Sequence, residues 1–142
     1  MLCALILAGG SGKRFWPLST EEKPKQLLQL FSEKTMVRET VERILLLIPG
    51  DRIFIATNIK QLEAVMSELP MIPEENFIVE PEIKDTAAAI GYSALVINRM
   101  KQRPTLLVLP SDHLIKDLGS FHKSVLLALS LIHISEPTRQ DT

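Results

Sequence analysis

The 142-residue sequence has one cysteine, almost no net charge and no long apolar run. A single cysteine, Cys3, excludes an internal disulfide framework and a zinc site built from cysteines. The net charge of −1 gives no general basic surface, so no nucleic-acid partner is expected and any anion binding has to be local. No apolar run approaches the roughly 20 residues of a membrane-spanning helix, which predicts no membrane partner.

The amino terminus also lacks the features of a secretion signal. Met1 and Leu2 lead directly into an apolar segment, without a basic leader and without a cleavage site of small residues. We therefore expect a cytoplasmic protein.

Apolar segments of strand length alternate along the chain with segments of helical periodicity. The predicted strands cover residues 2–7, 52–57, 76–80 and 105–110. The predicted helices run from about residue 35 to residue 48, from residue 59 behind a capping Asn58, from residue 86 to about residue 100, and from residue 120 to about residue 129. This alternation predicts an α/β fold with a mainly parallel sheet flanked by helices.

The last residues of the chain have a different character. The segment "LIHISEPTRQDT" at residues 131–142 shows neither a closing strand nor a helix. We interpret residues 1–129 as the native domain segment and residues 130–142 as a non-native tail, and we assign no function to the tail, His133 included.

The connection between the first strand and the first helix is unusually long. The strand ends near Ala8 and the helix begins near Thr35, whereas such connections usually take about 2–6 residues. Its glycines let the backbone approach a ligand closely, and its cations suit phosphate. These residues are Gly9, Gly10, Gly12, Lys13, Arg14 and, further on, Lys23 and Lys25. Because ligands bind at the carboxyl ends of strands in open α/β sheets, the connection predicts a polyphosphate site.

Two common phosphate-binding motifs do not fit this connection. The Walker pattern requires a glycine where Leu7 stands and a serine or threonine where Arg14 stands. The dinucleotide-binding pattern requires a third glycine where Phe15 stands. A polyphosphate site of another kind remains.

The segment "LAGGSGKRFWPLS", followed by "KPKQLL", resembles the signature of the sugar nucleotidyltransferases. The Trp16–Pro17 pair and the "PKQ" of residues 24–26 resemble the mannose-1-phosphate guanylyltransferase branch of that family. Two further segments fit in order and spacing, "VEPEIKDTAAAIGYSAL" from Val79 and "VLPSDHLI" from Val108. The resemblance covers about residues 1–129.

The resemblance implies a Rossmann-like nucleotidyltransferase fold and the transfer of GMP from GTP to mannose 1-phosphate, which gives GDP-mannose and pyrophosphate. It implies that Arg14 neutralises the leaving pyrophosphate and that Lys25 holds the α-phosphate. It also implies that Asp112 binds Mg²⁺, whose preference for hard oxygen ligands a carboxylate satisfies. The implied nucleotide-lining residues of the connection are Gly9, Gly10, Gly12 and Lys13, of which Lys13 departs from the family's usual threonine.

Further candidates for nucleotide recognition follow the third strand. The Glu80 carboxylate can accept from both N1–H and the exocyclic amine of guanine, an edge that adenine does not offer. The resemblance places the turn with Asp85, Thr86 and Ala87 against the base and the ribose. Structural roles stay open: Glu80 as a solvated strand end, Asp85 as a helix cap, and Asp112 as part of a turn.

Alternative functions also stay open. One is a related sugar-1-phosphate nucleotidyltransferase with another base or sugar, and another is a non-catalytic nucleotide-binding regulatory subunit. Molybdenum-cofactor guanylyltransferases share the Leu-Ala-Gly-Gly opening but lack the "WPLS…PKQ" continuation.

The catalytic unit that the sequence resembles is much longer than 142 residues. We therefore expect an N-terminal fragment with a truncated fold, which is inactive alone because sugar-binding strands and a second metal ligand would lie downstream. The expected partners of the full-length protein are GTP and mannose 1-phosphate. Its oligomeric state, a homo-oligomer included, and a fused isomerase domain stay open.

Overall fold

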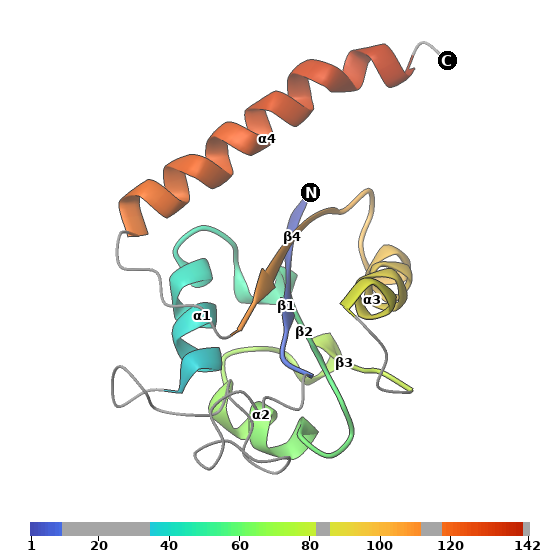
Figure 1. The fold of residues 1–142 in the computed structure, drawn as a ribbon. Coiled ribbons are helices and arrows are strands. Elements are labelled where there is room, and N and C mark those ends of the chain that lie inside the picture. Colours follow the sequence, from blue (N-terminus) through green and yellow to red (C-terminus); the bar gives the residue numbers. More distant parts are fainter. Residues whose placement is uncertain (10–34, 82–85, 112–117, 141–142) are drawn as a thin grey trace.

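The computed structural model describes residues 1–9, 35–81, 86–111 and 118–140. Four strands form one sheet in the order β3-β2-β1-β4, and every neighbouring pair is parallel (Figure 1). The strands are β1 (Leu2–Leu7), β2 (Ile53–Thr57), β3 (Phe77–Val79) and β4 (Thr105–Pro110). The predicted α/β fold with a parallel sheet is therefore confirmed.

The strand β1 lies inside the sheet and is buried on both faces. Its residues Cys3, Ala4, Leu5 and Ile6 are all fully buried. Because successive side chains of a strand point to opposite faces, Ala4 and Ile6 join one core cluster while Cys3 and Leu5 join another. A continuous apolar run is typical of a parallel strand that has helices on both sides.

Helices cover both faces of the sheet. On one face, α1 (Met36–Leu45) and α2 (Leu62–Glu68) contribute to the first core cluster, in which Val65 is fully buried. On the other face, α3 (Thr86–Met100) contributes the fully buried Ile97 to the second cluster. Figure 1 shows α1 and α3 on opposite sides of the strands. Burial of one such aliphatic side chain contributes about 1.5–3 kcal/mol to stability.

Several elements have the bounds that the sequence predicts. The strands β1 and β4 and the helix α3 match their predicted ranges. The helix α1 begins directly after Thr35, whose hydroxyl accepts a hydrogen bond of 3.3 Å from the Arg38 amide. This N-cap satisfies one of the amides that the first turn of a helix leaves without an intrahelical partner.

Among the predicted boundaries that differ in the structure, two lie where polar side chains organise turns. The Asn58 Oδ1 atom accepts from the Gln61 amide at 3.0 Å, as a cap would, but a turn follows and α2 begins only at Leu62. Asn76, predicted to start the third strand, belongs instead to the short 3-10 helix η4 (Glu74–Asn76). Its side-chain amide donates to carbonyls of residues 50, 51 and 53, at the entrance to β2, which fixes the entrance to β3 beside it.

The fourth helix is longer than predicted. We predicted a helix that ends near Leu129 and no helix in residues 131–142, whereas α4 runs from Leu118 to Gln140. The segment "LLALSLI" is rich in leucine and alanine, which favour helix, and it carries the helix past the expected end.

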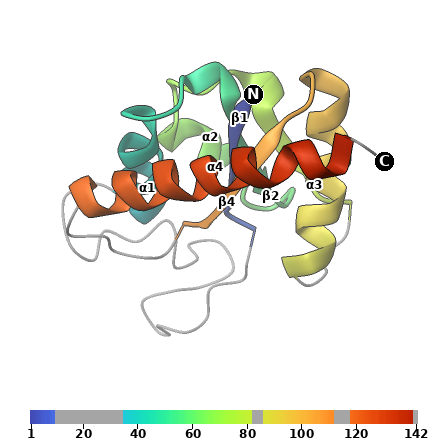
Figure 2. The same ribbon diagram turned by 90° about the horizontal axis from the view of Figure 1, so that it is seen from above.

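The helix α4 contacts the α1 side of the domain near its start. Phe121 packs against the first core cluster, and His122 Nε2 lies 3.1 Å from the carbonyl oxygen of Arg43. The Arg43 guanidinium carbon lies 5.8 Å from the centre of the Phe121 ring. Figure 2 shows α4 running across the width of the domain when it is seen from above. Within the described ranges, no helix combines the length and the apolar character needed to span a membrane.

Candidate active site

The candidate site lies at the carboxyl edge of the sheet, where the four strands end. Gly9 follows β1, Asn58 follows β2, Glu80 follows β3 and Ser111 follows β4. Because all four strands are parallel, these positions share one edge of the sheet (Figure 1). In open α/β sheets this is the edge at which ligands bind.

The structure brings two of the predicted site residues, Gly9 and Glu80, into contact. A Cβ atom on residue 9 would lie 3.3 Å from Glu80 Oε1 and 3.4 Å from the Cα atom of Thr57. The Glu80 carboxylate therefore rests against the backbone at Gly9. The backbone of Gly9 does not adopt the left-handed conformation, so the close approach of these neighbours explains the glycine.

The environment of Glu80 disfavours its charge. Burial raises the pKa of the Glu80 carboxyl above its usual value, because a partly desolvated carboxylate loses hydration. Among the described residues, no charged neighbour offsets this effect. The main-chain amide of Glu80 donates to the carbonyl of Thr57 at 3.0 Å, which fixes the start of the side chain. The result is a partly buried hydrogen-bond acceptor at the edge of the sheet.

Two other predicted residues, Thr86 and Ala87, lie in the first turn of α3. Both are exposed, so a ligand could reach them. In the part of the chain that the structure describes, no hydrogen bond joins either residue to Gly9 or Glu80. Their predicted contact with the base and ribose stays a prediction.

The remaining predicted site residues lie outside the described residues. They are Gly10, Gly12, Lys13, Arg14, Lys25, Asp85 and Asp112. Their roles stay predictions, although the structure describes their neighbours in the chain. Gly9 precedes the glycine- and cation-rich connection, and Ser111 directly precedes Asp112.

The described part of the chain can be searched for clusters of side chains that bind metal ions. No group of three or more histidine, cysteine, aspartate or glutamate side chains gathers there in a way that could hold a metal ion. Asp112 supplies the hard oxygen chemistry that Mg²⁺ prefers, and it follows the buried Ser111 at the candidate edge. The residue type and its place in the chain therefore fit Mg²⁺.

Three residues at this edge were missed by the sequence interpretation as site components. Thr57, Asn58 and Ser111 are buried, and their side chains donate hydrogen bonds to the carbonyls of residues 7–9. The available signal is their position, because each is a polar residue at or just after the end of an apolar strand. Of the three, only Asn58 has a role predicted from the sequence, that of a helix cap.

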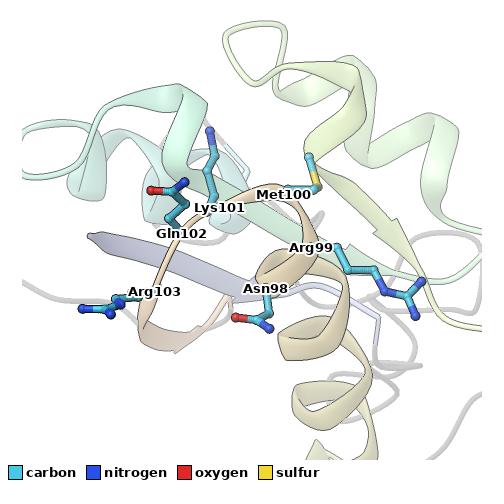
Figure 3. Close-up of a pocket in the computed structure, with 6 residues that line it drawn as sticks. All are labelled: Asn98, Arg99, Met100, Lys101, Gln102 and Arg103. Atoms are coloured by element: carbon cyan, nitrogen blue, oxygen red, sulfur yellow. The ribbon is translucent and has the colours of Figure 1, made fainter. Parts of the chain in front are cut away.

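A hollow at the other end of the sheet does not compete with this site. It has a volume of about 520 Å³ and is lined by residues 98–103, between the end of α3 and the start of β4. Figure 3 shows that its side chains diverge, with Arg99 and Arg103 pointing to opposite sides. The hollow therefore does not direct several groups at one ligand.

A parallel sheet with helices on both faces and polar groups gathered at its carboxyl edge defines the class of open α/β ligand-binding domains. The model of the nucleotidyl transferase family matches residues 3–130. The chain therefore belongs to the nucleotidyl transferase family, and the predicted resemblance is confirmed.

Curated relatives include bacterial proteins named for mannose-1-phosphate guanylyltransferase activity and for xanthan biosynthesis. Mannose-1-phosphate guanylyltransferase of Escherichia coli is 35% identical over 137 residues, which cover 90% of this chain and 27% of that protein. Xanthan biosynthesis protein XanB of Xanthomonas campestris pv. campestris is 39% identical over 126 residues, which cover 87% of this chain and 27% of that protein. The chain thus spans about a quarter of the length of these relatives.

Two solved structures share the fold. Mannose-1-phosphate geranyltransferase from Thermus thermophilus matches with a TM-score of 0.76 and 36% identity, over 92% of this chain and 38% of that chain. Mannose-6-phosphate isomerase from Helicobacter pylori matches with a TM-score of 0.72 and 29% identity, over 94% of this chain and 47% of that chain. Both likenesses agree with the Rossmann-like nucleotidyltransferase fold that the sequence predicts.

Proposed function

We propose that this chain is the nucleotide-binding part of a longer mannose-1-phosphate guanylyltransferase, an enzyme that transfers GMP from GTP to mannose 1-phosphate. The observation that carries the proposal is the contact between the Glu80 carboxylate and Gly9 at the carboxyl edge of the sheet. The similarity to relatives named for this activity, over 90% of the chain, supports the choice of base and sugar.

The proposed reaction needs little chemistry from the protein. An oxygen of mannose 1-phosphate bonds to the α-phosphorus of GTP, the bond from that phosphorus to the β-phosphate bridging oxygen breaks, and pyrophosphate leaves. The attacking oxygen is already anionic, so no general base is required. Positioning and charge stabilisation therefore supply most of the catalysis.

Cations of the glycine-rich connection are proposed to supply the charge stabilisation. Arg14 neutralises the leaving pyrophosphate with its planar fork of donors, and Lys25 holds the α-phosphate where the two substrates meet. Lys13 and the backbone amides of the glycines bind the remaining phosphate oxygens.

Recognition of guanine is proposed to depend on Glu80. Its carboxylate accepts from N1–H and from the exocyclic amine, and the absence of a side chain on Gly9 leaves room for it. Asp85, Thr86 and Ala87 would complete the contacts to the base and ribose. A charged acceptor shared by two donors favours GTP over nucleotides that lack this edge.

Magnesium is the proposed cofactor, with Asp112 as its ligand from this chain. When bound, the ion would neutralise charge on phosphate oxygens. We further propose a cytoplasmic location, where GTP and mannose 1-phosphate would both be available.

The isolated 142-residue chain is proposed to be inactive. It spans 27% of the Escherichia coli relative and 38% of the Thermus thermophilus chain, so residues that bind the sugar would lie elsewhere in the longer protein.

Pyrophosphate release by the full-length protein tests the proposed function. With mannose 1-phosphate present, we expect turnover with GTP and at least tenfold lower kcat/KM with UTP, dTTP or ATP. The isolated chain, assayed in parallel, should show no turnover. A preference for UTP or dTTP would instead indicate a related nucleotidyltransferase with another base. No turnover with any of these nucleotides and mannose 1-phosphate would indicate a regulatory subunit.

A further inference from the structure

Three successive carbonyls at the exit of β1 each accept a hydrogen bond from a side chain. Ser111 Oγ donates to the carbonyl of Leu7 at 2.7 Å. Thr57 Oγ1 donates to the carbonyl of Ala8 at 3.0 Å, and Asn58 Nδ2 donates to the carbonyl of Gly9 at 2.7 Å. The donors come from the ends of β4 and β2, the two strands that flank β1.

The three donors are all removed from solvent. Thr57 is 0% exposed, Ser111 is 3% exposed and Asn58 is 6% exposed. A buried polar group without a partner costs about 1–3 kcal/mol, so each of these hydrogen bonds is held firmly in the folded protein. The exit of β1 is therefore fixed from both flanking strands, although Ala8 and Gly9 lie past the last residue of β1.

Thr57 and Asn58 also connect this exit to the rest of the candidate site. The carbonyl of Thr57 accepts from the Glu80 amide at 3.0 Å, while its hydroxyl binds the carbonyl of Ala8. Thr57 thus fixes the main chain at Glu80 relative to the segment that leads into Gly9. Asn58 adds a link to the turn before α2, because its Oδ1 atom accepts from the Gln61 amide.

We propose that Thr57, Asn58 and Ser111 form a carbonyl clamp, which holds Gly9 in the place where the Glu80 carboxylate rests against it. The three are positioning residues, because they act through Gly9 and Glu80 and are not assigned to touch the nucleotide. This inference rests on the proposed function, in which Gly9 and Glu80 contact GTP.

The clamp has a physical reason. Beyond the end of β1, side chains take over part of the hydrogen bonding that a strand ladder would supply to the carbonyls. A carbonyl oxygen carries partial negative charge, so binding it to buried donors keeps it away from an anionic ligand. The ligand then meets an ordered edge, and less ordering free energy is lost on binding.

The central experiment compares two buried asparagines in the full-length protein. Asn58→Asp keeps the acceptor for the Gln61 amide but removes the donor to the Gly9 carbonyl. Asn76→Asp makes the same chemical change at the opposite edge, where Asn76 donates to the carbonyls of Asp51 and Ile53. We expect Asn58→Asp to raise KM for GTP about 5- to 10-fold, and Asn76→Asp to lower the melting temperature without changing KM for GTP.

A milder set of variants covers the case in which a buried carboxylate prevents folding. Thr57→Val removes the donor to the Ala8 carbonyl at nearly constant volume, and Thr57→Ser restores it. Ser111→Ala removes the donor to the Leu7 carbonyl. We expect a KM increase of about 3- to 10-fold for Thr57→Val and Ser111→Ala, with recovery in Thr57→Ser.

Hydrogen exchange separates the clamp from the proposed function. Without nucleotide, Thr57→Val should speed amide exchange at Ala8 and Gly9 at least threefold, and Asn76→Asp should not. If Thr57→Val speeds exchange but the wild-type protein shows no turnover, the clamp is supported and the proposed function is overturned. The clamp is overturned if Thr57→Val leaves the exchange at Ala8 and Gly9 unchanged. It is also overturned if the enzyme is active and Asn58→Asp and Asn76→Asp have equal KM values for GTP.

Discussion

Asn58 and Asn76 are buried at opposite ends of the neighbouring strands β2 and β3. Asn76 donates to the carbonyls of Gly50 and Asp51, in the 3-10 helix η3 (Gly50–Arg52), and to that of Ile53, the first residue of β2. Asn58 instead joins the exit of β1 to the turn before α2. Both side chains thus connect separate elements: Asn76 joins η4 to the entrance of β2 at the amino edge, and Asn58 joins β2 to the exit of β1 at the carboxyl edge.

The charged groups of the two edges differ in whether they point toward other polar groups or away from them. At the amino edge, Arg99 and Arg103 of the hollow point away from each other (Figure 3). At the carboxyl edge, the Glu80 carboxylate lies against Gly9, and burial raises the pKa of that carboxyl. Convergence of polar groups, rather than the presence of a hollow, therefore distinguishes the candidate site.

The largest contrast between the edges is expected from arginine substitutions. Arg14→Ala in the full-length protein should lower kcat/KM for GTP about 10²–10³-fold, because it removes charge stabilisation of the leaving pyrophosphate. Arg99→Ala, at the amino edge, should leave kcat/KM unchanged. Steady-state pyrophosphate release measures both. Equal effects of the two substitutions would contradict the assignment of the catalytic edge.

Substitution of Glu80 should have the next largest effect. Glu80→Gln keeps the shape of the side chain but loses the charged acceptor, so KM for GTP should rise about 10- to 100-fold. The matched control is Glu75→Gln, an exposed residue of η4 at the amino edge, which should not change KM. A GTP preference that survives Glu80→Gln would remove Glu80 from guanine recognition.

The effect of pH gives a smaller and independent test of Glu80. Because its folded-state pKa is raised, the protonated form fits the fold better, and stability is lost as pH rises through that pKa. Glu80→Gln should therefore stabilise the protein slightly at pH 7, and the advantage should vanish below the usual carboxyl pKa of 4.5. Thermal melts of the wild-type and variant proteins from pH 3.5 to 8 measure this. If the stability advantage of Glu80→Gln over the wild-type protein grew as the pH fell, the raised pKa of Glu80 would be contradicted.

Substitutions of two glycines give the smallest predicted effects. One substitution weakens GTP binding and the other stabilises the fold. Gly9→Ala pushes the Glu80 carboxylate aside by a few tenths of an ångström, so KM for GTP should rise about threefold to tenfold. Gly91→Ala lies in α3 with open space around the added methyl, and it should stabilise the fold by about 0.5–1 kcal/mol. KM measurements and denaturant unfolding check the pair. A stabilising Gly9→Ala with unchanged KM would show that residue 9 has room for a side chain.

The sequence predicts the sheet well because β1 and β4 are continuous apolar runs between clear turn signals. It predicts the edge at which Gly9 and Glu80 meet, since parallel strands place their carboxyl ends together. It does not predict why residue 9 is glycine, because the close neighbours come from β2 and from the residue after β3. Contacts across the sheet are set by strand order, which alternation alone leaves open.

The ends of helices are harder to predict than the strands of the sheet, because a single polar side chain or a short run of helix-forming residues can shift them. Asn58 is predicted to cap a helix from residue 59, but its side chain closes a turn, Gln61 is the N-cap residue of α2, and α2 starts three residues later than predicted. The predicted end of α4 is wrong because leucine and alanine continue the helix beyond Leu129. The carbonyl clamp was missed because hydroxyl and amide donors to a backbone leave no periodic pattern in a sequence.

A crystal structure of the full-length protein with GTP and Mg²⁺ would show directly whether the nucleotide binds at Gly9 and Glu80. We expect guanine within hydrogen-bonding distance of the Glu80 carboxylate and the nucleotide against Gly9, at the carboxyl edge of the sheet. A nucleotide bound in the hollow lined by residues 98–103, or anywhere away from Gly9 and Glu80, would contradict this expectation.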